Sequence, residues 1–217
     1  MAVGLVAEFI VAIDGPAGSG KSSVSKEVAR RLDFGYLDTG AGYRAFAVHK
    51  LHNPEVTLEQ LQTNFDYQIS HDPNDQWVRL GRADITDEIR QQAAADAVSG
   101  IAREQSVRQL QLDDALNRIK DCPHFGIVVE GRDITTRVAP HAQVRLLLTA
   151  SEETRLKRRG LEKTESAQSL ISRDQSDSKV VDFMTPADGV ILIDTTNLDF
   201  QQSVAAVLDV IEAVQHG

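Results

Sequence analysis

The chain is poor in several residue types, and each scarcity excludes a class of protein. One cysteine, Cys122, occurs among 217 residues, so no intrachain disulfide can form, which is typical of a reducing compartment. Aromatic residues make up only 5%, so the core has to be largely aliphatic. No apolar run approaches the roughly 20 residues of a membrane helix, and no Lys or Arg precedes the first run, as a secretory signal would require. We therefore expect a cytoplasmic protein that does not enter a membrane.

The remaining composition is that of an ordinary globular domain. Hydrophobic residues make up 41% and charged residues 25%, and the length suits one domain over residues 1–217. The formal net charge of -9 disfavours extended binding to DNA or RNA, because like charges repel. A small anionic ligand is still possible, because a local cluster of cations can bind phosphate within an acidic protein.

Short apolar runs alternate with helical patterns along the chain. Five runs are typical of strands buried on both faces of a sheet: residues 9–13, 36–37, 127–129, 144–148 and 190–193. Helical patterns occupy residues 22–32, about 89–119 and about 200–214. Strands that alternate with helices predict an α/β fold with a parallel sheet covered on both faces.

Two segments depart from this alternation. Residues 63–86 hold short alternating pieces separated by turn residues such as 72–75, which predicts small antiparallel strands inserted between helices. Residues 155–179 are rich in Arg, Lys, Ser, Asp and Gln. A solvated pair of helices is one interpretation of this second segment, and a mobile flap over a site is the other.

A glycine-rich motif follows the first apolar run. Residues 15–22 fit G-x-x-x-x-G-K-[ST] at every fixed position. Glycines let successive backbone N–H groups point at phosphate oxygens, and the following helix directs its positive end at the same anion. The Lys21 ammonium would reach the outer phosphates, and the Ser22 hydroxyl would bind Mg²⁺. The residues expected around a nucleoside triphosphate are Gly15, Pro16, Ala17, Gly18, Ser19, Gly20, Lys21, Ser22 and Ser23.

Missing motifs narrow the type of nucleotide-binding protein. A GTPase would be expected to carry N-K-x-D and an ABC-type ATPase L-S-G-G-Q, and neither occurs in this sequence. The chain is also short for a motor or helicase core. A kinase that acts on a small phosphorylated or hydroxylated substrate fits the length better.

Two arginines follow predicted strands and could hold a second anion. Arg44 lies just past residues 36–37, and Arg132 follows residues 127–129. The carboxyl ends of parallel strands meet at one edge of the sheet. Both arginines would therefore face the phosphate loop, the glycine-rich residues 15–22, and could pair with a phosphate. A plain surface position is the alternative for Arg44. The neighbouring Asp133 either accepts a hydrogen bond from an exocyclic amine or caps a helix.

Three further arginines start the second unusual segment. Arg155, Arg158 and Arg159 stand at i, i+3 and i+4, so one helical face could present them. Such a face is either simply exposed or supplies charge to a transferring phosphoryl group. Arg173 and Asp177 follow with helical spacing.

Together these motifs resemble the bacterial cytidylate kinase family over nearly the whole chain. The combination of D-T-G-x-x-Y-R, E-G-R-D and R-D-x-x-D is more specific than the phosphate loop alone. The matching segments are residues 13–23, 36–44, 89–90, 99–102, 107–108, 128–140, 146–151 and 173–177.

The resemblance implies a three-layer P-loop kinase fold with a five-stranded parallel sheet. It adds a small antiparallel insertion that binds the nucleoside monophosphate, about residues 63–92, and a short lid, about residues 155–179. It also implies phosphorylation of CMP and dCMP that depends on ATP and Mg²⁺. Two departures stand out: the lid between Arg159 and Arg173 is shorter than usual, and Val180 replaces an expected arginine beside Lys179.

The resemblance also assigns roles to individual residues. Arg44 and Arg132 would hold the monophosphate, and the lid arginines Arg155, Arg158 and Arg159 would meet the ATP phosphates. Ser99, Arg108 and Asp133 match positions that read the cytosine edge. Thr39, Tyr43, Arg173 and Asp177 match positions around the nucleoside.

We therefore expect a monomeric ATP-dependent phosphotransferase that converts CMP or dCMP to its diphosphate. One alternative is a kinase of the same fold with another acceptor, such as UMP, AMP, shikimate or a coenzyme precursor. The other is a nucleotide-binding regulatory module with little catalysis, which the short lid and Val180 favour.

Overall fold

The central sheet is built from the apolar runs of the sequence. In the computed structural model, which describes residues 7–162 and 185–216, five strands pair in the order β2-β6-β1-β7-β8, and every pair is parallel. The predicted five-stranded parallel sheet is therefore confirmed. The strands are β1 (Phe9–Asp14), β2 (Gly35–Asp38), β6 (Gly126–Gly131), β7 (Val144–Thr149) and β8 (Ile191–Asp194).

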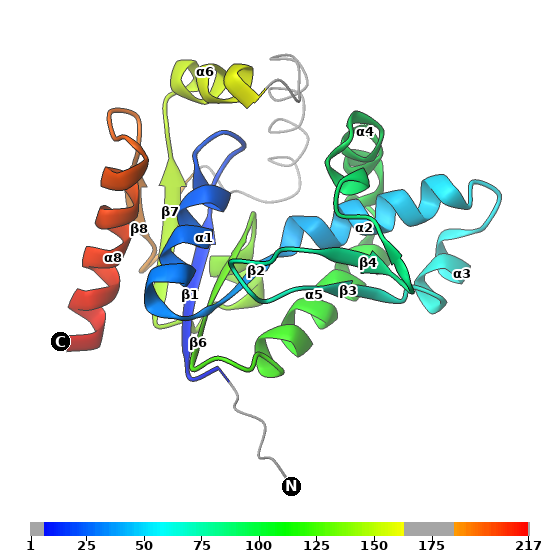
Figure 1. The fold of residues 1–217 in the computed structure, drawn as a ribbon, viewed down its shortest axis with the longest axis horizontal. Helices are drawn as coiled ribbons and strands as arrows, with labels where there is room; N and C mark the ends of the chain where they lie inside the picture. Colours follow the sequence, from blue (N-terminus) through cyan, green and yellow to red (C-terminus); the bar gives the residue numbers. More distant parts are fainter. Residues whose placement is uncertain (1–6, 163–184, 217) are drawn as a thin grey trace, which may run out of the picture.

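Helices cover both faces of this sheet, because neighbouring residues of a strand point to opposite sides. Val11 and Ile13 of β1 pack with α1 (Lys21–Leu32) and α8 (Phe200–His216) on one face. Ala12 packs on the other face with α2 (Thr39–His52) and α5 (Gln105–Lys120). The result is the three-layer arrangement visible in Figure 1.

The segment between β2 and β6 carries the small antiparallel sheet that the sequence predicts. Helices α2 and α3 (Leu58–Thr63) precede strands β3 (Tyr67–Ile69), β4 (Val78–Leu80) and β5 (Ala83–Asp84). These strands pair in the order β3-β4-β5, both pairs antiparallel. The small sheet is tied to the central sheet, because the backbone N–H of Tyr36 donates to the carbonyl of His71 over 2.9 Å.

The helical pattern predicted over residues 89–119 consists of three separate pieces. They are the 3-10 helix η1 (Glu88–Arg90), α4 (Gln92–Ile101) and α5. The backbone is extended at Gln91 and at Glu104, which ends one helix and starts the next. In Figure 1, α4 lies on the right of the view, and α6 (Glu152–Glu162) lies at the top left.

Helix α6 begins the segment predicted to form the lid. The structure describes this segment only as far as residue 162, so residues 163–179, with Arg173 and Asp177, lie outside the described part of the chain, as does Val180. The division into an insertion of about 63–92 and a lid of about 155–179 stays a prediction. No helix within residues 7–162 and 185–216 is long and apolar enough to span a membrane.

Candidate active site

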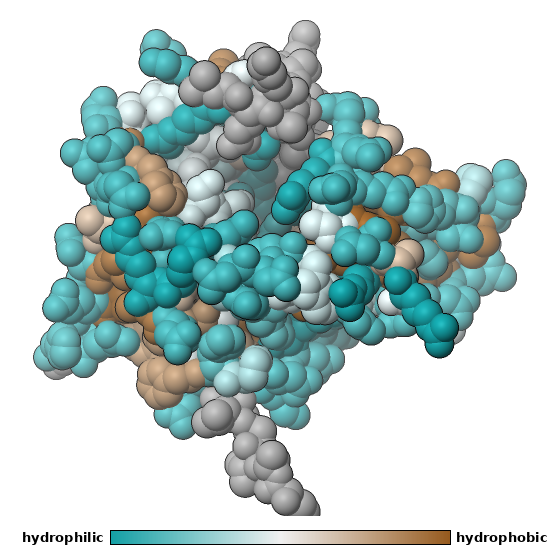
Figure 2. All heavy atoms as spheres, in the orientation of Figure 1, coloured by the Kyte–Doolittle hydropathy of each residue, from teal (hydrophilic) through white to brown (hydrophobic). Residues whose placement is uncertain are grey.

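A cleft of about 770 Å³ opens at the carboxyl ends of the central strands. This volume lies within the range of small-molecule sites, roughly 300–1,000 Å³. Figure 2 shows the hollow beneath α6, bordered mainly by hydrophilic residues. Its lining includes most of the phosphate loop and four arginines from three elements: Arg44 of α2, Arg90 of η1, and Arg158 and Arg159 of α6.

The phosphate loop, residues 15–22, connects β1 to α1. Gly18 and Gly20 have φ values of 78° and 89°, a region that glycine enters without steric cost. A Cβ on Gly18 would also lie 2.8 Å from the carbonyl oxygen of Arg155. Gly20 caps α1, which starts at Lys21, so the unpaired N–H groups of the first helical turn lie in the cleft wall.

Lys21 forms an ion pair with the buried carboxylate of Glu130. Its Nζ lies 3.5 Å from Oε2 of Glu130, and the hydroxyl of Tyr36 donates to Oε1 of Glu130 over 2.9 Å. Burial lowers the pKa of Lys21; Glu130 opposes this effect, whereas Arg132 and Arg159 add to it. Burial and the Glu130 carboxylate raise the pKa of Tyr36 well above its ordinary value. Lys21 is thus a cation among other cations, and the carboxylates of Glu130 and Asp38 favour its charged form.

Arg44 is held in place by the residue that starts its own helix. Asp38 accepts the N–H of Ala41 over 3.1 Å as the cap of α2. Its second oxygen, Oδ2, lies 2.6 Å from Nη2 of Arg44. Burial lowers the pKa of Arg44, but the charges of Asp38 and Glu130 outweigh this, so the pKa is raised overall. Arg44 therefore keeps its positive charge at the cleft wall.

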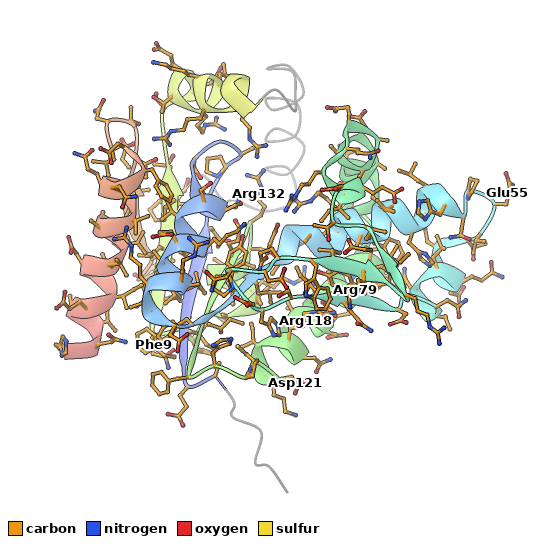
Figure 3. All side chains as sticks on the ribbon, in the orientation of Figure 1. Phe9, Glu55, Arg79, Arg118, Asp121 and Arg132 are labelled. Atoms are coloured by element: carbon orange, nitrogen blue, oxygen red, sulfur yellow. The ribbon has the colours of Figure 1, made fainter. Side chains whose placement is uncertain are left out.

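Arg132 and Asp133 follow β6 directly. Nη1 of Arg132 donates to the carbonyl of Gly15 over 3.0 Å, and Figure 3 shows this side chain near the upper end of the sheet. Asp133 lies 3.4 Å from Arg108 and 3.9 Å from Arg137, measured to their guanidinium nitrogens. Burial raises the pKa of Asp133, and the two arginines counteract this. Arg108 and Asp133, predicted from separate motifs, are brought together here.

The lid arginines contact the phosphate loop from α6. Arg155 donates to the carbonyl of Ala17 over 3.0 Å. Arg158 donates to the carbonyl of Ser19 over 3.2 Å and to the backbone and hydroxyl oxygens of Thr195. Arg158 and Arg159 also line the cleft. Helix α6 is therefore fastened to the loop by side chains that donate to backbone carbonyls.

The remaining predicted residues are placed less directly. Thr39 donates to the carbonyl of Glu130 over 2.8 Å, so it braces the end of β6. Tyr43 packs against the apolar cluster around Phe46. Ser99 belongs to α4, but its side chain lies outside the described part of the chain.

Sequence reasoning left several residues of this region out of the predicted site. Arg90 and Phe200 line the cleft, and Glu130 with Tyr36 holds Lys21. Arg90 and Glu130 do lie within matched segments, which was the available signal. Tyr36 also lies within a matched segment, residues 36–44, but an aromatic residue at a strand start is usually part of the core. Phe200 lies outside the matched segments and gave no such signal.

Comparisons with known proteins agree with these observations. The model of the cytidylate kinase family matches residues 11–213. A cytidylate kinase from Cutibacterium acnes is 41% identical, with 94% of this chain and 96% of that protein covered. One from Thermotoga neapolitana is 37% identical, with 94% and 97% covered. A solved gluconokinase from Sinorhizobium meliloti 1021 has a TM-score of 0.50 at 12% identity, with 97% of each chain covered, and shares the fold. The chain thus belongs to the cytidylate kinase family.

Proposed function

We propose that this protein transfers the γ-phosphoryl group of ATP to the phosphate of CMP or dCMP, giving ADP and CDP or dCDP. The observation that carries the proposal is the meeting of two anion sites at one cleft. The phosphate loop with Lys21 lines one side of the cleft, and Arg44 lines the other. Arg132 lies beside the loop, where it donates to the carbonyl of Gly15. In-line transfer between two phosphates needs this arrangement of positive charge more than it needs covalent chemistry.

On the donor side, the loop amides and Lys21 would hold the ATP phosphates. The Ser22 hydroxyl, which lines the cleft directly after Lys21, offers the oxygen ligand that Mg²⁺ prefers. Bound there, Mg²⁺ would neutralise charge that develops on the phosphates. Arg155, Arg158 and Arg159 would add positive charge when the lid closes, and closure would exclude water that could hydrolyse ATP.

On the acceptor side, Arg44 and Arg132 would bind the monophosphate, and Arg90 adds a third cation on the same cleft wall. The acceptor oxygen is already anionic, so the reaction needs no strong general base. Thr39, Tyr43, Arg173 and Asp177 would surround the nucleoside. We further propose that the enzyme works as a monomer in the cytoplasm.

Choice of base would rest on Ser99, Arg108 and Asp133. The exocyclic amino group of cytosine is a hydrogen-bond donor, and carboxylates accept from it. Uracil carries a carbonyl at that position, so a carboxylate there would face another acceptor. Arg108, 3.4 Å from Asp133, would orient the carboxylate and contact the ring. This pair would favour CMP over UMP by contact and by repulsion.

The test is ADP release from Mg²⁺-ATP with CMP, dCMP, UMP, AMP and GMP supplied separately. We expect strong stimulation by CMP and dCMP alone. Stimulation by another monophosphate would retain the kinase and discard the cytosine site. Tight ATP binding with no stimulation by any acceptor would favour the regulatory module instead.

A further inference from the structure

Asp14 is a buried carboxylate that the proposed reaction does not use. It ends β1 and is 3% exposed. Its Oδ1 accepts the backbone N–H of Ile134 over 2.9 Å. Its Oδ2 accepts the N–H of Thr135 over 2.8 Å and the Thr135 hydroxyl over 2.6 Å. Burial raises the pKa of Asp14, and these three donors oppose the rise.

The segment that Asp14 contacts is a π-helical turn, η2 (Ile134–Val138). The N–H of Val138 donates to the carbonyl of Asp133 over 3.2 Å, and that of Ala139 donates to Ile134 over 2.8 Å. The turn has no side-chain cap of its own, so its first N–H groups need acceptors from elsewhere. Asp14, 120 residues away along the chain, accepts the first of them. Turns of this kind occur frequently at functional sites.

In a second contact, a side chain of the 131–135 segment binds the backbone of the phosphate loop. The residue after Asp14 is Gly15, whose carbonyl accepts Nη1 of Arg132 over 3.0 Å. Asp14 also stands opposite Gly131 in the β1–β6 pairing. Residues 14–15, which open the phosphate loop, and residues 131–135, which carry Arg132 and Asp133, therefore hold each other through side chains from both segments.

We propose that Asp14 is a positioning residue that couples the two substrate sites. By capping η2, it fixes the backbone that presents Arg132 and Asp133 relative to the loop that binds the triphosphate. Ordering the loop with ATP then orders the acceptor side, and the coupling works equally in reverse, as linkage requires. The names of the two substrates rest on the function proposed above; the contact between the two segments does not.

Substitution by asparagine separates this role from simple packing. Asp14→Asn keeps the shape of the side chain but leaves one acceptor oxygen and adds one NH₂ donor. If the remaining oxygen accepts from Thr135, the NH₂ group faces the N–H of Ile134, and two donors oppose each other. Thr135→Val removes only the hydroxyl bond, and Thr135→Ser restores it. Asp113→Asn is the matched control, because Asp113 is an exposed carboxylate on α5, outside the insertion, that accepts a hydrogen bond from Gln109 over 2.9 Å.

The experiment compares these four variants with the wild type. Steady-state kinetics give kcat and KM for CMP and for ATP, and equilibrium titration gives the Kd for ATP without CMP. Losing a hydrogen bond to a charged group predicts that Asp14→Asn lowers kcat/KM for CMP about 10- to 100-fold. The Kd for ATP alone stays within about threefold of wild type, because the loop amides are retained. Thr135→Val shows a smaller loss, and Thr135→Ser and Asp113→Asn behave like the wild type.

Amide hydrogen exchange at Ile134 and Thr135 gives a readout that does not depend on turnover. ATP alone should slow exchange there in the wild type and have little effect in Asp14→Asn. Equal losses of ATP affinity and CMP use in Asp14→Asn would overturn the coupling, as would wild-type kinetics in both Asp14→Asn and Thr135→Val. Should Asp14→Asn fail to fold, the Thr135 pair decides by the same criteria. Should the wild type not use CMP, the proposed function fails, and the effect of ATP on exchange alone accepts or rejects the coupling.

Discussion

The two sides of the cleft are built in different ways. The donor side is one run of residues, 15–22, whose glycines and helix start present backbone N–H groups. The proposed acceptor side would collect side chains from separate elements, including Arg44 of α2, Arg108 of α5 and Arg132 after β6. The geometry of a site made of backbone N–H groups is set by the residues of that one segment. A side-chain site depends on partners that hold each charged group in position.

Carboxylates are those partners on the acceptor side. Asp38 lies 2.6 Å from Arg44, and Asp133 lies 3.4 Å from Arg108. Lys21, where the two sides meet, lies 3.5 Å from Glu130. Each pair lies partly or wholly out of solvent, where charges interact more strongly than at the surface. Local cations of this kind would let an acidic chain of net charge -9 bind the two anions of the proposed reaction.

Lys21→Met removes the cation that lies where the two sides of the cleft meet, and we expect it to have the largest effect on turnover. Removing a positioned charge from a transition state costs roughly 10²- to 10³-fold in kcat. The fold should persist, because Lys21 opens a helix at the cleft rather than filling the core. The turnover rate measures the loss of catalysis, and the thermal midpoint of unfolding measures whether the fold persists. A near-normal turnover rate would show that the phosphate loop is wrongly assigned.

Arg132→Ala tests the acceptor side alone. We expect KM for CMP to rise about 10- to 100-fold, the value for a charge-assisted phosphate contact, with little change in ATP affinity. Arg31→Ala is the control, because Arg31 is an exposed arginine in the last turn of α1, with Nε 3.0 Å from Oε1 of Glu27. Initial rates measured while the CMP and ATP concentrations are varied independently give the separate KM values for CMP and for ATP. Unchanged kinetics with CMP would remove Arg132 from the acceptor site.

Asp133→Asn tests the choice of base, because it leaves the cations proposed to bind the phosphates unchanged. A base contact is worth about 1–3 kcal/mol of discrimination, so the ratio of kcat/KM for CMP over UMP should fall about 5- to 100-fold. Asp96→Asn is the control, because Asp96 is an exposed carboxylate on α4 that accepts a hydrogen bond from Gln92 over 2.7 Å. A constant CMP-to-UMP ratio in Asp133→Asn would place base recognition elsewhere.

His71→Asn gives the smallest expected effect and concerns stability rather than catalysis. Burial, with the charge of Arg118, lowers the pKa of His71 below its ordinary value. Between that lowered pKa and about 6.5, the unfolded chain binds more protons, so wild-type stability falls as pH falls through this window. His71→Asn should lose less stability there. Denaturant unfolding at pH 7 and pH 5 measures the difference, and equal slopes with pH would contradict it.

Local patterns explain which parts of the fold could be predicted. Residues 9–13 and 144–148 are too apolar to be anything but buried strands or helices, and their length favours strands. Residues 63–86 carry turn residues at short spacing, and the small sheet follows. The breaks at Gln91 and Glu104 could not be read, because no glycine or proline marks either position.

What the sequence determined by itself was the phosphate loop and the alternation of strands with helices, because both depend on neighbouring residues. The tertiary structure alone decided which charges meet. Tyr36 and Glu130 are 94 residues apart and Asp14 and Thr135 are 121 apart, and only the order of strands β2-β6-β1 brings these pairs to the same edge. Burial then gives those hydrogen bonds their importance, because a polar group removed from water must find its partner within the fold.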